Sequence, residues 1–489
     1  MKQLRNQHML FMVMLILVVA ALSYWMFEVR ADDAYITYRY ARNLIEGKGF
    51  VFNPGENVLG TTSPLHGLLL GVLGLIFSDL PVVANVIGFI SIFILAVLMY
   101  LILSHLGRAR AGLVSGLLVA TTVWSYVFVP LETVLSAAMG WAIIYFYLKD
   151  NLRGVSVLGA LALITRGDNA LLLALIYLFH WLQNRQMLRL IKHALATMLI
   201  ASPWLIFAYL TYGSIIPNSV ATKSGWEGHL LTFVEQVWPK ILRRLLMDSS
   251  WVSGVFVALA VVGLAYLVLD KVNRKLLVVP VWMVAYTMTY TALQIWLPFS
   301  WFYYPIVCGT LLLSGMGLDK LLQLLDQRIL SPSWLKTALR WGVIGLLGLL
   351  LILQVAWMRS FALAMPQHVF LGARDNLYRA VALWLRENTS AVDTIATGEI
   401  GTIAYYSDRT VIDLLGLTAA QVGDHMKRND YEWAIEFYRP DYIIVNDRRR
   451  DSSTGPLPWF ARTAQDYRWL RSFDLAYYPY YIDVYQRLR

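Results

Sequence analysis

The most suggestive chemical feature of the sequence is a pair of adjacent carboxylates, Asp32 and Asp33, which follows the first long apolar run. A carboxylate at a membrane edge is suited to act as a general base, and two carboxylates together are suited to bind a divalent cation. Adjacent side chains point in different directions, so we expect one to be the base and the other to orient groups or bind a cation. The alternative interpretation is a solvated helix N-terminus, where the helix dipole favours acidic residues.

Four other charged residues are predicted on the same outer face of the membrane. Glu132 opens an apolar run, and Arg166 and Asp168 lie in a short turn between two others. An arginine in apolar surroundings is costly, so we expect Arg166 to pair either with Asp168 or with an anionic ligand. Lys223 follows at the start of a long loop, where it either meets a phosphate or remains a solvated charge.

An aromatic run between Trp296 and Pro305 includes Tyr303 and Tyr304. Aromatic residues are typical of the belt at a membrane interface, and the functional alternative is a wall that stacks on a sugar or guides a lipid. The histidines, His66 among them, lack the spacing of metal ligands. The sequence also lacks a Walker loop, a dinucleotide-binding glycine motif and a nucleophile elbow, so we do not expect nucleotide-driven chemistry.

The composition indicates that membrane helices position these residues. Of 489 residues, 58% are hydrophobic and only 15% are charged, whereas about a quarter of a soluble protein is charged. This excludes an ordinary soluble enzyme and a disordered chain. Cys308 is the single cysteine, which excludes an internal disulfide. The net charge of +10 is better explained by basic cytoplasmic loops than by nucleic-acid binding, and we expect no nucleic-acid partner.

Loop charges predict the topology. Lysine and arginine gather in every second connection, which places those connections in the cytoplasm. The alternation holds only if the short run 64–78, which begins at Pro64, is re-entrant or interfacial on the outer face. We therefore expect about eleven spans in the cell (inner) membrane, with a cytoplasmic N-terminus and an external C-terminus. The apolar runs are 8–27, 64–78, 82–104, 112–129, 132–148, 155–165, 169–183, 194–212, 251–269, 277–296, 301–318 and 341–362.

The predicted fold class is a polytopic α-helical membrane protein with a C-terminal extracytoplasmic α/β domain. We assign residues 1–365 to the membrane domain, with external loops at 28–81 and 213–249, and residues 366–489 to the α/β domain. In the latter, apolar patterns predict helices and alternating patterns predict strands. The helices are expected near 377–385 and 431–437, and the strands near 394–397, 411–414, 442–445 and 481–485.

The segment from Asp32 to Leu44, followed by Gly47 to Glu56, resembles the first external loop of the GT-C superfamily of integral-membrane glycosyltransferases. The likeness is greatest to the branch of mycobacterial terminal arabinofuranosyltransferases of the AftB type. The turn that follows reads Thr61-Thr62-Ser63-Pro64-Leu65-His66, where Tyr-Thr-Asn-Pro-Leu-Trp is more usual. Weaker likenesses continue along most of the chain, at 131–133, 165–168, 213–223, 401–406 and 412–417.

The resemblance implies an inverting transferase that takes a sugar, arabinofuranose or a hexose, from a polyprenyl-phosphate donor. The acceptor would be an extracytoplasmic glycan or glycolipid of the cell envelope. By resemblance the first Asp, Asp32, is the general base, and Asp33 orients it or binds a divalent cation such as Mg²⁺, Mn²⁺ or Ca²⁺. The donor phosphate would meet the cationic residues Arg166, Lys223 and Arg39, and the candidate substrate contacts are Tyr35, Glu132, Asp168, His66, Tyr303 and Tyr304.

Two other functions compete with a transferase. A transporter or flippase of lipid-linked intermediates would have internal repeats and charges deep within its spans; here the unusual polar residues gather at the outer face. A non-catalytic membrane scaffold would tolerate substitution of Asp32 and Asp33 without loss of its role.

Overall fold

The computed structural model describes residues 2–224, 250–269, 271–293, 300–328, 333–364, 374–428, 430, 432–449, 462–475 and 480–488. The chain forms two compact units. Unit 1 comprises residues 1–27, 86–202 and 227–363, and unit 2 comprises residues 28–85, 203–226 and 364–489. The expected division placed all of residues 1–365 in one domain, whereas in the structure the segments 28–85 and 203–226 are grouped with the C-terminal tail.

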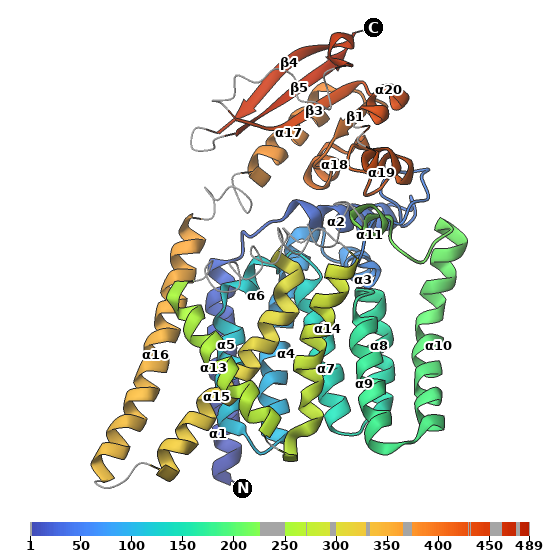
Figure 1. Ribbon diagram of the computed structural model, residues 1–489. Coiled ribbons are helices and arrows are strands. Elements are labelled where there is room, and N and C mark those ends of the chain that lie inside the picture. The colour runs from blue at the N-terminus through green and yellow to red at the C-terminus, as the bar shows by residue number, and fades with distance from the viewer. Residues whose placement is uncertain are drawn as a thin grey trace. The chain divides into compact units, whose positions relative to one another are not determined.

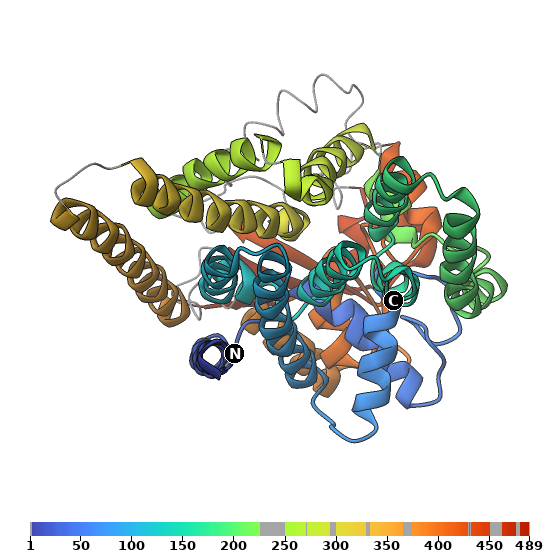
Figure 2. The ribbon, with the colours of Figure 1, turned by 90° about the horizontal axis from the view of Figure 1, so that it is seen from below.

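Unit 1 is helical. Figure 1 shows its helices side by side, and Figure 2, seen from below, shows them nearly end-on. Small residues let some of these helices approach closely: Gly263 of α13 meets the backbone of Leu313 on α15, and Gly317 of α15 meets the backbone of Leu259. The helices that contribute to unit 1, wholly or in part, are α1 (Lys2–Trp25), α4 (Leu80–His105), α5 (Ala109–Thr121), α6 (Val123–Val127), α7 (Thr133–Leu148), α8 (Leu152–Thr165), α9 (Asn169–Asn184), α10 (Met187–Tyr212), α13 (Ser250–Leu269), η1 (Lys271–Leu277), α14 (Val278–Ala292), η2 (Ser300–Tyr303), α15 (Tyr304–Arg328) and α16 (Ser333–Ala364).

Four helical segments within the described residues are long and apolar enough to cross a membrane: Leu80–His105, Met187–Tyr212, Trp301–Leu325 and Thr337–Ala364. In the last of these, only 11% of the apolar window is buried by protein, which suits a surface that faces lipid. Other apolar helices are shorter. The expected count of about eleven spans and the sidedness of the termini stay predictions.

Unit 2 combines residues 28–85 and 203–226 with the C-terminal sheet. Its helices from these two segments are α2 (Asp32–Ile45), α3 (Pro64–Gly74) and α11 (Asn218–Lys223). With 11 residues, α3 is much shorter than the about 20 that cross a bilayer. The tail contributes α17 (Arg374–Asn388), β1 (Thr394–Thr397), α18 (Gly401–Ser407), β2 (Thr410–Asp413), α19 (Ala420–Lys427), α20 (Trp433–Tyr438), β3 (Tyr442–Arg449), η5 (Ala464–Asp466), β4 (Tyr467–Asp474) and β5 (Tyr480–Arg487).

The five strands form one mixed sheet in the order β2-β1-β3-β5-β4. Strand β1 is parallel to β2 and β3, and β5 is antiparallel to β3 and β4. The four strands expected from the sequence are confirmed, as are the expected helices, seen as α17 and α20. Sequence patterns missed β4, α18 and α19.

Alternating apolar residues give the sheet two buried faces. Ile395 and Val411 point to one face, where they pack with α17, α18 and the aromatic residues of α2 and its following loop. Ala396 and Ile412 point to the other face and pack with α19 and α20. The helix that carries the acidic pair is therefore part of the same core as the C-terminal sheet.

Candidate functional site

The acidic pair lies in the first turn of α2, and its two carboxylates have different surroundings. Asp32 is 3% exposed. Its oxygens accept hydrogen bonds from the backbone N–H groups of Gly401, at 3.1 Å, and Thr402, at 2.7 Å. Both donors belong to the first turn of α18, whose N–H groups have no partners within their own helix. Asp32 thus joins α2 to the C-terminal part of unit 2.

The close approach of α18 to Asp32 depends on a glycine. A Cβ at Gly401 would overlap the backbone carbonyl of Asp32 and lie 3.0 Å from its Oδ2. Burial raises the pKa of Asp32 above its ordinary value, although the N–H of Thr402 and the charge of Arg374 act in the opposite direction. Asp32 is therefore a buried, fixed carboxylate.

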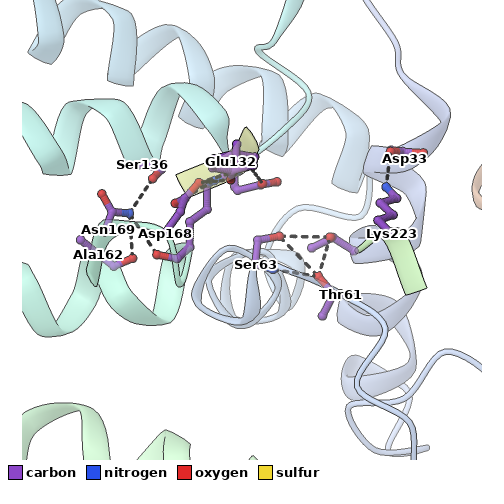
Figure 3. Close-up of polar contacts among 12 residues, drawn as sticks. Asp33, Thr61, Ser63, Glu132, Ser136, Ala162, Asp168, Asn169 and Lys223 are labelled. Carbon is purple, nitrogen blue, oxygen red and sulfur yellow. Dashed lines mark hydrogen bonds and ion pairs between the residues drawn. The ribbon is translucent and has the colours of Figure 1, made fainter. Parts of the chain in front are cut away.

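Asp33 differs from Asp32 both in the exposure of its side chain and in the group that it faces. Its side chain is 31% exposed, and its Oδ2 lies 3.8 Å from Nζ of Lys223, as Figure 3 shows. The amide of Asn218, at the start of α11, donates to the carbonyl of Gly416 at 2.7 Å, and Thr222 donates to the same carbonyl at 3.0 Å. These contacts hold α11 in place, so that a lysine is fixed beside an accessible carboxylate.

A third carboxylate, which sequence reasoning missed, lies in the electrostatic surroundings of the pair. Asp375 of α17 is buried, and neither of its oxygens has a hydrogen-bond partner among the described residues. Burial raises its pKa to about 7; the charges of Asp32 and Asp33 act in the same direction, and those of Arg374 and Arg30 oppose them. An Asp in the first turn of a helix is common, so no local pattern around Asp375 indicates this placement.

Three hydroxyl groups connect α2 to the turn that precedes α3 (Figure 3). Thr37 Oγ1 lies 2.9 Å from Thr61 Oγ1 and 3.3 Å from Ser63 Oγ, and the last two oxygens are 3.4 Å apart. All three side chains are buried. The Thr-Thr-Ser-Pro turn noted in the sequence therefore positions α3 against α2.

Arg39, a candidate phosphate ligand, is instead bound to backbone carbonyls. Its Nε donates to Phe52 at 3.0 Å, its Nη2 donates to Arg409 at 2.9 Å, and its Nη1 donates to Ala404. The side chain is 2% exposed, and burial lowers its pKa to about 10. Arg39 ties α2 to the segment from α18 to β2 and does not present its charge at the surface.

Tyr35 and His66, two candidate substrate contacts, are buried within unit 2. The hydroxyl of Tyr35 lies 3.4 Å from that of Tyr406, and its ring contacts the ring of Tyr405. Both residues therefore belong to the interior that supports the acidic pair.

Unit 1 carries a separate charged cluster, which comprises Glu132, Arg166, Asp168, Tyr286 and Tyr290. We call it the Arg166 cluster. Arg166 donates to Glu132 through Nη1 at 2.8 Å and to Asp168 Oδ2 through Nη2 at 2.8 Å. The hydroxyls of Tyr286 and Tyr290 donate to the same Oδ2 at 3.1 and 2.7 Å. The structure thus brings together three residues that the sequence placed on one face.

The turn that holds Arg166 and Asp168 is fixed by Asn169. Its amide donates to Ser136 Oγ at 2.9 Å and to the carbonyls of Ala162 and Arg166, both at 3.1 Å (Figure 3). Burial by itself would raise the pKa of Asp168, but the Arg166 guanidinium and the tyrosine hydroxyls hold it below its usual value. Asp168 is therefore kept ionised.

The aromatic run contributes to unit 1 through its buried members. The Tyr304 hydroxyl donates to Ser125 Oγ at 3.0 Å, and Tyr303 is buried as well. The guanidinium carbon of Arg166 lies 5.7 Å from the centre of the Phe302 ring, a cation–π distance. Trp296 lies outside the described residues. The described part of the run thus packs inside unit 1.

The described residues do not form a metal site. No group of three His, Cys, Asp or Glu side chains among them is arranged to hold a metal ion. Asp32 is already bound by two N–H groups, and Asp33 faces Lys223. These residues do not fit a divalent cation as they stand, so we derive no step from one.

Comparison with known proteins identifies the fold. The structure of ArnT from Cupriavidus metallidurans bound to undecaprenyl phosphate is similar, with a TM-score of 0.63 and 13% identity, over 96% of this chain and 97% of that chain. The oligosaccharyltransferase AglB from Archaeoglobus fulgidus, in complex with an inhibitory peptide and a dolichol-phosphate, has a TM-score of 0.57 and 11% identity, over 88% of this chain and 69% of that chain. The structure of an oligosaccharyltransferase from Archaeoglobus fulgidus tethered to an acceptor peptide has a TM-score of 0.61 and 13% identity, over 90% of this chain and 69% of that chain.

These likenesses show the fold alone: the chain shares the fold of the ArnT and AglB structures, and its described residues include four helices long and apolar enough to cross a membrane. They do not distinguish the AftB-type branch from others. Residues 367–485 match a family described as Domain of unknown function (DUF8728). No curated protein has a matching sequence.

Proposed function

We propose that this protein is a glycosyltransferase that moves a sugar from a polyprenyl-phosphate donor to an extracytoplasmic glycan or glycolipid acceptor, with inversion. The observation that carries the proposal is Asp33, an accessible carboxylate 3.8 Å from the ammonium of Lys223. A base beside a cation is the minimum that this reaction needs. Support comes from the fold shared with ArnT, which was solved with undecaprenyl phosphate.

In the proposed reaction, Asp33 accepts the proton of an acceptor hydroxyl while that oxygen attacks the anomeric carbon of the donor. The bond between the anomeric carbon and the phosphate oxygen breaks, and the electron pair leaves with the polyprenyl phosphate. Lys223 offsets the charge that develops on the departing phosphate.

We assign the base to Asp33 rather than to Asp32, although the resemblance implies the first carboxylate of the pair. Asp32 is buried, and its oxygens are occupied by the N–H groups of Gly401 and Thr402. A base must reach the proton that it abstracts. Asp32 then acts as a positioning residue that fixes the start of α2, and with it the direction of Asp33.

The finer assignments are also part of the proposal. The sugar is arabinofuranose or a hexose, and arabinofuranosyl transfer would place the chain with the AftB-type enzymes. The N-terminus is cytoplasmic, and the α/β part faces the outside of the cell (inner) membrane. A C-terminal reporter that is active only in the cytoplasm is expected to be silent, and a bright reporter would contradict this orientation.

The test is a donor panel offered to the purified protein in lipid nanodiscs with a cell-envelope acceptor extract. Transfer of sugar and release of polyprenyl phosphate are measured together, for wild type and Asp33→Asn. We expect one donor to be turned over and the variant to lose about 100-fold or more of the rate. Asp424→Asn, which changes an exposed carboxylate of α19, serves as the control and is expected to keep the wild-type rate.

Other outcomes would favour the competing functions. Movement of the lipid-linked sugar across the bilayer without transfer would favour a flippase. Neither movement nor transfer with any donor would favour a scaffold.

A further inference from the structure

A small cavity lies inside unit 1, beside the Arg166 cluster. Its lining includes Thr133 and Ser136 of α7, Arg166 and Asp168 of the turn before α9, and Trp282 and Tyr286 of α14. Its volume is about 20 Å³, and about 10–15 Å³ is enough for one water molecule. The cavity therefore has room for a single hydroxyl group or a water molecule.

Two of the lining side chains carry polar atoms without partners. Thr133 Oγ1 and Trp282 Nε1 are buried, in side chains that are 4% and 3% exposed, and neither has a hydrogen-bond partner within the part of the chain that the structure describes. A buried hydroxyl or indole N–H without a partner is unfavourable. A ligand that both accepts and donates hydrogen bonds would satisfy both groups.

Asp168 adds acceptor capacity to the same cavity. Its Oδ2 already receives the Arg166 guanidinium and the hydroxyls of Tyr286 and Tyr290. The only bond to its Oδ1 among the described residues is a long one, at 3.3 Å, from Nε of Arg166. An ionised carboxylate oxygen accepts more than one hydrogen bond, so Oδ1 is able to accept a further hydrogen bond from a hydroxyl group.

The charge of the Arg166 cluster selects against an anion. Two carboxylates, Glu132 and Asp168, surround one guanidinium, and both are in direct contact with it. A phosphate would have to displace a carboxylate from Arg166 and would meet a net negative charge. A neutral hydroxyl group meets no such barrier.

We propose that this cavity is a subsite for a sugar hydroxyl group, so that the Arg166 cluster recognises the sugar rather than the donor phosphate. This inference rests on the proposed function for the sugar's source, which is either the lipid-linked donor or the acceptor glycan. Thr133 and Trp282 would bind the hydroxyl directly, and Asp168 would accept a hydrogen bond from it.

Two conservative variants test the subsite. Thr133→Val and Trp282→Phe each remove one unpartnered group and keep most of the side-chain volume. Trp141→Phe is a matched control, because Trp141 is also buried with an unpartnered Nε1 among the described residues, and its ring centre is 6.4 Å from that of Trp282. Trp141 is not part of the cavity lining.

Binding is measured by calorimetry in nanodiscs with three probes: the sugar-bearing lipid identified by the donor panel, sugar-free polyprenyl phosphate, and a soluble acceptor glycoside. We expect Thr133→Val and Trp282→Phe to weaken the binding of one sugar-bearing probe by about three- to tenfold. Sugar-free polyprenyl phosphate should bind as tightly as it does to wild type. Trp141→Phe should change none of the three affinities.

The probes also separate the possible sources and failures. Weakening confined to the sugar-bearing lipid assigns the subsite to the donor, and weakening confined to the glycoside assigns it to the acceptor. Unchanged binding of both in the two variants, or an equal loss for sugar-free lipid, overturns the subsite and leaves the proposed function standing. Failure of the proposed function is seen separately, as a donor panel in which no lipid-linked sugar is turned over.

Discussion

The acidic pair of unit 2 and the Arg166 cluster of unit 1 hold their carboxylates in opposite ways. In the cluster, Glu132 and Asp168 are in direct contact with Arg166 at 2.8 Å, and both are largely buried. In the pair, Asp33 is partly exposed and faces Lys223 across 3.8 Å. A group that gains and loses a proton must be accessible to the substrate and must not be tightly bound to a neighbouring group. A recognition site instead needs fixed hydrogen-bond donors and acceptors. In the function that we propose, the acidic pair therefore takes part in the reaction and the Arg166 cluster binds the sugar.

The largest effect on stability is expected from Arg166→Met. The substitution leaves Glu132 and Asp168 as buried carboxylates without their cation, a loss of about 3–5 kcal/mol. Thermal unfolding in detergent, followed by intrinsic fluorescence, measures it. The combined variant with Glu132→Gln and Asp168→Asn should recover much of the loss; no recovery would show that the charges are not the cause.

A smaller loss is expected from Gly401→Ala. The added Cβ would overlap the carbonyl of Asp32 and push α18 away from the start of α2. We expect a loss of about 1–3 kcal/mol together with slower transfer, because Asp33 is then less well positioned. Gly167→Ala, where nothing lies within 4 Å of the added carbon, is the matched control. Equal melting temperatures for the two variants would contradict the contact.

Asp375 predicts a pH dependence of stability. Its pKa is raised from 3.8 to about 7, so the folded state holds this proton more tightly than the unfolded state. Its contribution is greatest at low pH and falls as pH rises toward about 7. Asp375→Asn should therefore raise the melting temperature by a few degrees at pH 8 and by less at pH 5. An equal shift at both values would exclude a buried, protonated Asp375.

The smallest effect on stability is expected from Lys223→Gln. The pair with Asp33 is partly exposed and 3.8 Å long, so its loss should cost less than about 1 kcal/mol. The transfer rate should nevertheless fall by about tenfold or more, because the departing phosphate loses a cation. A rate equal to that of wild type, measured at saturating donor, would remove Lys223 from the reaction.

Much of the fold could be predicted from the sequence, because the strong patterns survive in the structure. Strand β1 coincides with the alternating segment 394–397. Strand β4 was missed because its residues are mostly exposed and include Arg468 and Arg471, which hides the alternation. The helix α18 was missed because seven residues are too few for a helical period to be recognised.

The acidic pair could be located from the sequence, but the roles of its two carboxylates could not be assigned. The sequence identified Asp32 and Asp33, yet the groups that distinguish them, the N–H donors of Gly401 and Thr402, lie about 370 residues further along the chain. A similar separation along the chain explains why the structural role of Arg39 was not predicted, because its carbonyl partners include Ala404 and Arg409. Local patterns cannot show such partners, because they depend on how the tail packs on α2.

The most direct test of the assignment compares Asp33→Asn with Asp32→Asn in one transfer assay, with melting temperatures recorded for both. We expect Asp33→Asn to keep the wild-type melting temperature and to lose about 100-fold or more of its rate. Asp32→Asn should lower the melting temperature and leave the folded fraction measurably active. Full activity in Asp33→Asn, with none in folded Asp32→Asn, would contradict the assignment and make Asp32 the base.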